Sequence, residues 1–159
     1  MPVVATTQQR AKLGATCAEL GLDDTHATAA HVDKSAFSMW VPGVVEAVER
    51  LPAGGADVLI VGIETHICVL QTSLDLLARG HRVWIVQDGV SSCNAEERAV
   101  ALDRLRQEGA RVTTSESVIY ECLGDAADPA FKGVAALVKE SKESTVEGLR
   151  RLCGIGSKI

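Results

Sequence analysis

The sequence predicts an α/β fold with a mostly parallel sheet. Two patterns alternate from residue 42 onward: short runs of β-branched apolar residues, and longer segments with an apolar residue at every third or fourth position. The first pattern is typical of buried strands and the second of amphipathic helices. Each helical segment is long enough to return the chain to a parallel strand. A length of 159 residues fits one domain with one core.

Four strands are predicted. A short strand at Pro2 to Thr6 comes first, and three apolar runs follow at Asp57–Val61, Arg82–Val86 and Arg111–Thr114. The near-continuous apolarity of the runs at 57–61 and 82–86 predicts burial on both faces. These two strands are therefore expected inside a parallel sheet.

Helices are predicted between these strands. Pro42 suits the first turn of one helix, and Leu70, Leu74 and Leu77 form one face of the next, which ends at Gly80. Asn94 and Glu97 have the spacing of a capping box at the start of a third helix. The stretch from 8 to 33 predicts only an Ala-rich helical patch around residues 15–20 and then a polar loop.

The C-terminal third is predicted to be helical. Ser115 is a candidate cap, a turn is expected near Gly124, and a helix follows from about Pro129 to Val138. Residues 1–140 are therefore predicted to form the domain. Residues 141–159 are polar or weakly amphipathic and are expected to be a loosely held tail.

Composition argues against several classes of protein. The chain is 47% hydrophobic and 23% charged, which is ordinary for a globular domain. The net charge of -5 and the lack of a Lys/Arg run argue against nucleic-acid and membrane-surface partners. No apolar run reaches the ~18 residues of a membrane span, and the N-terminus lacks the pattern of a secretory leader. The five cysteines lie at least 25 residues apart and form no CxxC pair, so a structural metal is not expected and a reducing compartment is. The glycines form no GxGxxG or P-loop, and no cofactor is predicted.

Cys68 occupies a position suited to chemistry. It follows the strand at 57–61 and opens the leucine-rich helix, and ligands of open α/β sheets bind at the carboxyl ends of strands. The helix dipole and free N–H groups at this place would favour a thiolate. On position alone, a small buried structural cysteine remains the alternative.

Five segments carry a family resemblance. The loop from Gly62 to Thr72, which contains Cys68, resembles the nucleophile loop of the isochorismatase-like hydrolases, and Lys34–Met39 resembles that family's catalytic-lysine segment. The eukaryotic isochorismatase-domain-containing proteins and the mitochondrial-associated ribonuclease group are the subgroups that it resembles most. The resemblance runs from about Val3 to Lys139, and three further landmarks follow in the family's order: Asp88–Ser92, Thr113–Ser117 and Gly124–Lys132.

The resemblance implies a three-layer α/β/α, Rossmann-like fold and a role for each matching residue. Cys68 would attack a carbonyl or related electrophile as a thiolate, and Lys34 would stabilise that thiolate and the charged intermediate. Backbone N–H groups near Glu64 and Cys68 would form the oxyanion hole, in a loop whose cis peptide bond maps to Ile63-Glu64.

The resemblance also places Phe37, Gln8 and His66 at the pocket. Plain core is the alternative for Phe37, and an exposed loop histidine is the alternative for His66, which we do not assign to catalysis. No metal is implied, because the Asp-His cluster of the metal-binding relatives has no counterpart here. A small-molecule substrate, a homo-oligomer, and a cytoplasmic or mitochondrial location are expected from the family.

One departure from the family concerns the first strand. In the family a strand with a V-D-x-Q motif precedes the segment that residues 1–8 resemble, and its Asp is the general base. None of Asp23, Asp24 and Asp33 matches that place. The family's strand order of 3-2-1-4-5-6 would leave an empty position at the centre of the sheet, between the strands at Val3 and Val58. An incomplete gene sequence, a partner or exchanged strand, and a degenerate protein are the three accounts of this departure.

Two functions are therefore expected from the sequence. The first is hydrolysis of a small molecule's amide, ester-like or vinyl-ether bond by Cys68 with Lys34. The alternative is a catalytically impaired family member that acts as an interaction or regulatory protein. A nuclease activity rests only on the name of one subgroup and conflicts with the acidic charge.

Overall fold

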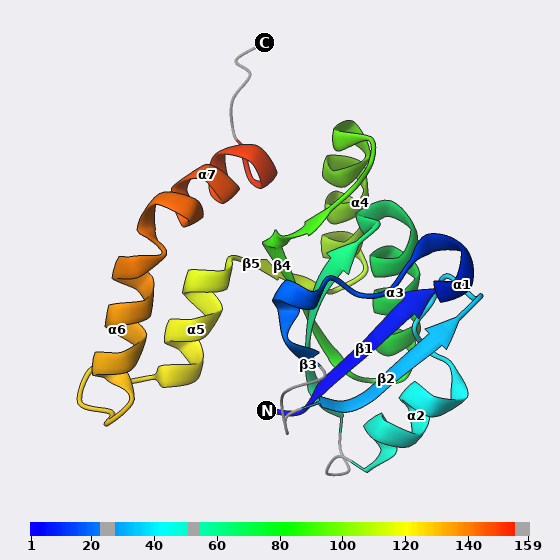
Figure 1. Ribbon diagram of the computed structural model, residues 1–159, viewed down its shortest axis with the longest axis horizontal. Coiled ribbons are helices and arrows are strands. Elements are labelled where there is room, and N and C mark those ends of the chain that lie inside the picture. Colours follow the sequence, from blue (N-terminus) through cyan, green and yellow to red (C-terminus); the bar gives the residue numbers. More distant parts are fainter. Residues whose placement is uncertain (23–27, 51–54, 155–159) are drawn as a thin grey trace.

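The strands of the computed structural model, which describes residues 1–22, 28–50 and 55–154, form two parallel sheets (Figure 1). The first sheet pairs β1 (Val3–Gln8) with β2 (Thr28–Lys34). The second has the order β3-β4-β5, with bounds Asp57–Ile63, Arg82–Ser91 and Arg111–Thr113. No backbone ladder joins β1 to β3 among these strands. The predicted α/β class with a parallel sheet is confirmed.

Short helices connect and follow the strands. A 3-10 turn at Ala18–Leu20 and a π-helical turn at Thr65–Val69 accompany them. The α-helices are α1 (Arg10–Leu13), α2 (Pro42–Glu49), α3 (Leu70–Ala78), α4 (Ala95–Gln107), α5 (Ser115–Leu123), α6 (Phe131–Glu140) and α7 (Lys142–Leu152). None of the helices in the described ranges is long and apolar enough to cross a membrane.

The core lies between the three-stranded sheet and the pair α3 and α4. Figure 1 shows these two helices on one side of the sheet and the arm α5–α7 on the other. Ile85 of β4 and Leu105 of α4 are fully buried at the centre of the cluster, and Leu76 of α3 packs there too. Helices α6 and α7 contain no fully buried residue, so burial on their side of the sheet is much thinner.

Three expectations about the elements were wrong. The stretch from 8 to 33 contains most of the strand β2, whose sequence TAAHVDK lacks the apolar run that marks β3 and β4. The Ala-rich patch forms only one 3-10 turn. The run at 57–61 is not buried on both faces, since Val61 is 61% exposed where β3 has no partner strand on one side.

The predicted caps also differ from the observed ones. Asn94 begins α4 but its side chain makes no capping hydrogen bond. Thr114, not Ser115, caps α5 by accepting from the Ser117 N–H, because the Ser115 hydroxyl donates to Asp88 instead. Asp23 and Asp24 lie outside the described residues.

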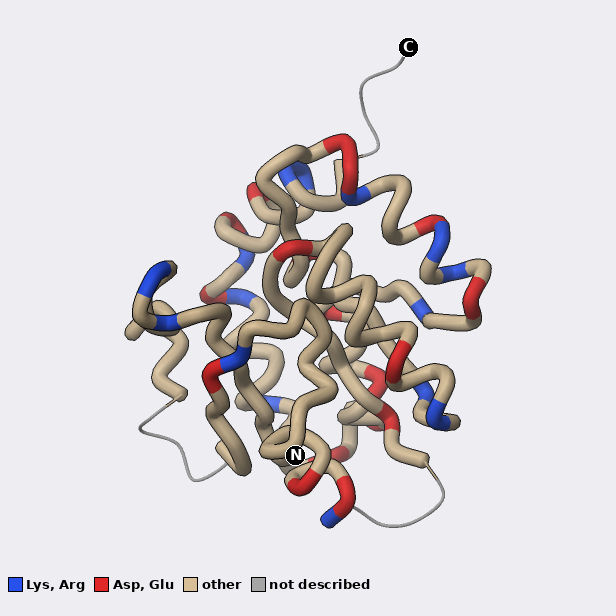
Figure 2. Tube along the Cα trace, turned by 90° about the vertical axis from the view of Figure 1, so that its right-hand side faces the viewer, with Lys and Arg blue, Asp and Glu red and all other residues tan. Residues whose placement is uncertain are grey.

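Most of the predicted tail is the helix α7. It lies against β4, and the Arg98 guanidinium of α4 donates to the carbonyl of Arg151 at 2.9 Å. Figure 2 shows Lys and Arg interspersed with Asp and Glu along the chain, α7 included.

Candidate active site

Three strands end at the same edge of the molecule. Gln8 is the last residue of β1, Lys34 is the last of β2, and the two are register partners in the parallel ladder. Ile63 ends β3 and leads into the π-helical turn that holds Cys68. Parallel pairing brings Gln8 and Lys34 together although they are distant in sequence, and the carboxyl ends of strands are the usual place for ligand binding in α/β sheets.

Lys34 is a buried ammonium group with three hydrogen-bond acceptors. Its side chain is 7% exposed, and Nζ donates to Gln8 Oε1 at 2.6 Å, to the Ala36 carbonyl at 2.9 Å and to the Phe37 carbonyl at 3.0 Å. Gln8 is fixed in turn, because its Nε2 donates to the Ser35 carbonyl at 2.8 Å. Three acceptors offset much of the cost of burying the charge.

Lys34 and Cys68 interact electrostatically. Burial lowers the pKa of Lys34 below its usual value, while the neighbouring Cys68 and Asp33 act in the opposite direction and raise it. Cys68 itself is half-buried and carries a free thiol. The two residues that the sequence places at the centre of the chemistry are therefore brought together by the fold.

The turn that carries Cys68 is tied to its surroundings by buried hydroxyl groups. The peptide bond Ile63-Glu64 that precedes it is cis, as the resemblance implies. Thr65 is completely buried and its Oγ1 donates to the Ser91 carbonyl at the end of β4, at 2.9 Å. The Ser73 hydroxyl donates to the Val69 carbonyl at 2.7 Å. A hydroxyl group can donate a hydrogen bond to a buried carbonyl and takes up less volume than a larger polar side chain. These two hydrogen bonds therefore hold the turn in a tightly packed part of the molecule.

The remaining predicted pocket residues have different environments. Phe37 is 53% exposed, so it is not core, and its carbonyl is one of the acceptors of Lys34. His66 is half-buried, and its Nδ1 lies 3.0 Å from Ser92 Oγ, so it is not an exposed loop histidine. Asp33 ties β1 to β2, because its Oδ1 accepts from Thr7 Oγ1 and from the Arg10 N–H, each at 2.9 Å.

Two pairings near the site are not predictable from sequence spacing. Asp88 accepts from both the backbone N–H and the hydroxyl of Ser115, so the two downstream landmarks contact each other. The backbone N–H of Cys93 donates to Glu64 Oε2 at 2.6 Å. Glu64, His66 and Cys93 have ligand atoms within 4.8 Å of one another, and they form a group among the described residues that could hold a metal ion.

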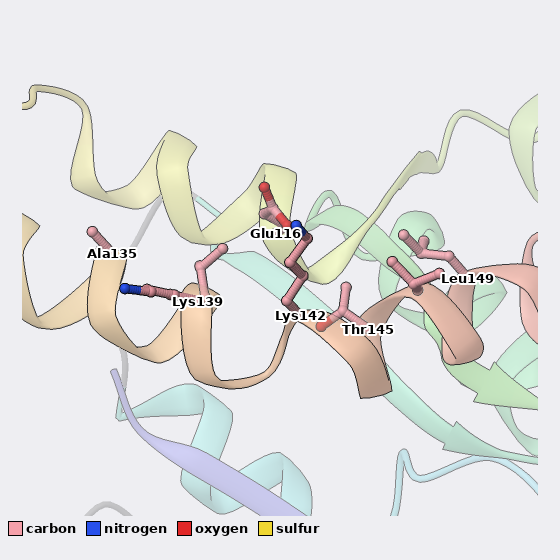
Figure 3. Close-up of a pocket in the computed structure, with 8 residues that line it drawn as sticks. Glu116, Ala135, Lys139, Lys142, Thr145 and Leu149 are labelled. Carbon is pink, nitrogen blue, oxygen red and sulfur yellow. The ribbon is translucent and has the colours of Figure 1, made fainter.

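A separate hollow lies between the helices of the arm. Its volume is about 450 Å³, and it is lined mainly by the apolar side chains Val138, Val146 and Leu149 (Figure 3). Figure 3 shows Lys142 pointing toward Glu116 beside it. Neither Cys68 nor Lys34 lines this hollow, so it is not the candidate active site.

The fold and the site define a class: an α/β protein with a free cysteine and a buried lysine at the carboxyl edge of parallel strands. The family model of the isochorismatase domain matches residues 1–117. The chain belongs to the isochorismatase family.

Relatives and solved structures agree with this assignment. The chain is 45% identical over 141 residues to the secreted isochorismatase effector Isc1 of Phytophthora sojae, covering 88% of this chain and 67% of that one. It is 43% identical over 150 residues to isochorismatase domain-containing protein 2 of Bos taurus, covering 94% and 71%. The structure of MAR1 ribonuclease from Caenorhabditis elegans superimposes with a TM-score of 0.77 at 37% identity, covering 87% and 70%. The resemblance to these subgroups is confirmed, and the chain spans about two thirds of the length of such relatives.

Proposed function

We propose that this protein is a cysteine hydrolase that cleaves an amide, ester-like or vinyl-ether bond of a small molecule, with Cys68 as the nucleophile. The placement of the buried Lys34 ammonium and the half-buried free Cys68 thiol within electrostatic range of each other, at the carboxyl ends of β2 and β3, supports this proposal. A fixed positive charge beside a thiol stabilises the thiolate, which is the reactive form.

The residues divide the chemistry as follows for an amide. The Cys68 thiolate attacks the carbonyl carbon, a C–S bond forms, and the π electrons move to oxygen. Backbone N–H groups near Glu64 and Cys68 stabilise that oxyanion. The Lys34 ammonium stabilises the negative charge of the thiolate and of the intermediate. Collapse breaks the C–N bond, the amine leaves with a proton, and water then releases the acid from the thioester and restores the thiol.

The proton steps of this reaction need a general acid-base group. The family resemblance assigns it to an Asp on a strand between the positions of β1 and β3, and we propose the same source for this protein. Phe37, Gln8 and His66 would border the substrate, with Gln8 acting through Lys34. A homo-oligomer and a cytoplasmic or mitochondrial location remain predictions from the family.

A second function is favoured by a separate observation. The described strands β1 and β3 have no common neighbour, and no acid of the described residues is assigned to the proton steps. A family member with this arrangement would act as an interaction or regulatory protein. Nuclease activity is disfavoured, because a net charge of -5 opposes binding of a polyanion.

A substrate screen tests the first function. A panel of amides, esters and vinyl ethers is incubated with this chain and with an N-terminally extended form, each beside its Cys68→Ser and Lys34→Met variants. Turnover that falls at least about 10³-fold in Cys68→Ser and about 10²-fold in Lys34→Met supports hydrolysis. Cys17→Ser removes an exposed cysteine and serves as the matched control, which should keep full activity.

Thiol alkylation separates the two functions where no substrate is found. Cys68 and Cys153 are both half-buried, and burial raises the pKa of the Cys153 thiol. A hydrolase should show Cys68 alkylated much faster than Cys153 at neutral pH, and more slowly in Lys34→Met. Equal rates at the two cysteines, with biological activity retained in Cys68→Ser, would support the regulatory function instead.

A further inference from the structure

A second group of reactive side chains lies beside the turn of Cys68. Glu64 and His66 follow β3, and Cys93 follows the neighbouring strand β4. Their ligand atoms, one from each residue, all lie within 4.8 Å of one another. The side chains of Glu64 and His66 are 26% and 19% exposed, and Cys93 is open to solvent. An ion could therefore reach the group from the Cys93 side.

The three side chains are held close together by the fold itself. The Cys93 N–H donates to Glu64 Oε2 at 2.6 Å, which fixes the carboxylate against the turn after β4. The His66 ring is oriented by Ser92, whose Oγ lies 3.0 Å from Nδ1. Thr65, between Glu64 and His66, is fully buried and donates a hydrogen bond to the Ser91 carbonyl, so the turns after β3 and β4 are held side by side. Glu64 and His66 are therefore ordered before an ion binds, and the Cys93 side chain is the part of the group that must still be ordered.

The chemistry of the set points to one kind of ion. A thiolate, an imidazole and a carboxylate are the ligands of zinc, whereas magnesium and calcium prefer sites made of oxygen alone. Tetrahedral bonds of about 2.0–2.3 Å place ligand atoms roughly 3.5 Å apart, so the group needs only a small closure that rotation of the exposed Cys93 can supply. Three protein ligands also leave the fourth position open to water.

We propose that Glu64, His66 and Cys93 bind a divalent transition-metal ion of the zinc type, next to the turn that holds Cys68. The inference does not depend on hydrolysis by Cys68, because neither Cys68 nor Lys34 is among the three ligands. It departs from the sequence-based expectation of no metal, since that expectation considered only ligands close together in the sequence, a CxxC pair and an Asp-His cluster. Here the ligands come from two segments that are 29 residues apart at Glu64 and Cys93.

Metal titration of the purified protein tests this proposal. Metal-free protein is titrated with Co²⁺, followed by optical absorption, and then with Zn²⁺ in competition and by calorimetry. One equivalent of Co²⁺ should bind with a thiolate-to-metal charge-transfer band. The band should disappear in Cys93→Ser, and Zn²⁺ affinity should fall at least about 10-fold in Cys93→Ser and in His66→Ala.

Two matched variants locate the thiol ligand. Cys122→Ser removes another exposed cysteine, and Cys68→Ser removes the candidate nucleophile; both should keep the band and the affinity. Loss of the band in Cys68→Ser would place the ion at the nucleophile and overturn the proposal. Equal Zn²⁺ affinity in the unmodified protein and in Cys93→Ser would overturn it as well. Circular dichroism of each variant shows that the fold is retained, so that a lost site is not a lost structure.

Discussion

At the scale of single residues, the bond between Gln8 and Lys34 couples two strands to the candidate nucleophile. Lys34 is charged and nearly inaccessible, and only three acceptors compensate its burial. Two of these are backbone carbonyls of the chain that follows β2. Gln8 is the only side-chain acceptor of the three, and its position is determined by parallel pairing of β1 with β2. The compensation of the buried Lys34 charge therefore depends on a residue that lies 26 positions away in the sequence.

Substitution of Gln8 by alanine should measure this dependence. The variant leaves a buried ammonium with one acceptor fewer, so we expect the free energy of unfolding to fall by about 1.5–3 kcal/mol. Urea unfolding followed by circular dichroism gives the value. Gln107→Ala is the matched control, because its amide donates to Asp103 on the exposed surface of α4, and it should change stability by under about 0.5 kcal/mol. Equal losses in the two variants would show that the bond to Lys34 contributes nothing beyond a surface hydrogen bond.

Cys68 and Lys34 could be predicted from sequence because each lies in a contiguous motif. The Gln8 contact, the Asp88 to Ser115 bonds and the position of Cys93 could not, since each joins residues more than 25 positions apart. No local pattern specifies such pairs; they arise from the register of parallel strands. The candidate reacting groups could thus be predicted from the sequence, whereas their supporting contacts depend on the fold.

At the scale of elements, strands with a contiguous apolar run could be predicted from the sequence, and a strand without one could not. Runs rich in valine and isoleucine marked β3 and β4, whereas β2 went unpredicted because Val32 is its only branched apolar residue. The apolar character of β3 also led to the wrong expectation of burial on both faces. Apolar composition predicts strand formation, but burial depends on which neighbours cover the strand.

Gly89 in β4 tests how closely β3 and β4 pack. A Cβ at this position would lie 2.9 Å from Val61 Cγ1 and 3.3 Å from the Val86 carbonyl oxygen. Gly89→Ala should therefore lower the free energy of unfolding by about 1–3 kcal/mol, because a β-branched side chain and a backbone oxygen leave little room to adjust. Gly133→Ala in α6 is the control; nothing lies within 4 Å of its Cβ, and alanine favours a helix by about 0.5–1 kcal/mol. Both values come from urea unfolding, and a neutral Gly89→Ala would contradict the close packing.

The ion pair between Asp57 of β3 and Arg82 of β4 gives these strands a pH dependence. Two guanidinium hydrogen bonds from Arg82, and then one from the Trp84 indole N–H, hold the pKa of Asp57 well below its usual range. Because the folded-state pKa is lower than the unfolded value of about 3.8, the pair stabilises the fold fully above that pH and loses its effect as the pH falls below it.

Asp57→Asn should reveal this dependence. The difference in unfolding free energy between the unmodified protein and the variant should be largest near neutral pH and should shrink as the pH falls below about 3.8. Urea unfolding at about pH 7 and at two values below 3.8 measures it. A difference that stays constant over this range would mean that the carboxylate gains nothing from Arg82 in the folded state.

At the scale of the whole molecule, the division into two sheets is the feature with the widest consequences. In the part of the chain that the structure describes, β1 is paired only with β2, and β3 only with β4. β3, whose other side has no partner strand among the described residues, carries Val61 and Ile63, which are 61% and 68% exposed. Apolar edge strands with free backbone groups pair readily with other strands, which is the usual route to self-association.

We therefore expect this chain to associate with itself, and Val61→Lys to weaken that association. A lysine on an edge strand opposes pairing, because its charge would have to be buried against the added strand. Sedimentation velocity over a range of protein concentrations measures the effect, and the apparent association constant should fall at least about 10-fold, an effect of about 1.4 kcal/mol. Val100→Lys places the same charge at a valine of α4 that is 68% exposed, away from either sheet edge, and should leave association unchanged. If the protein is a monomer at every concentration, the expectation is wrong. If both variants weaken association equally, the cause is net charge and not the edge of β3.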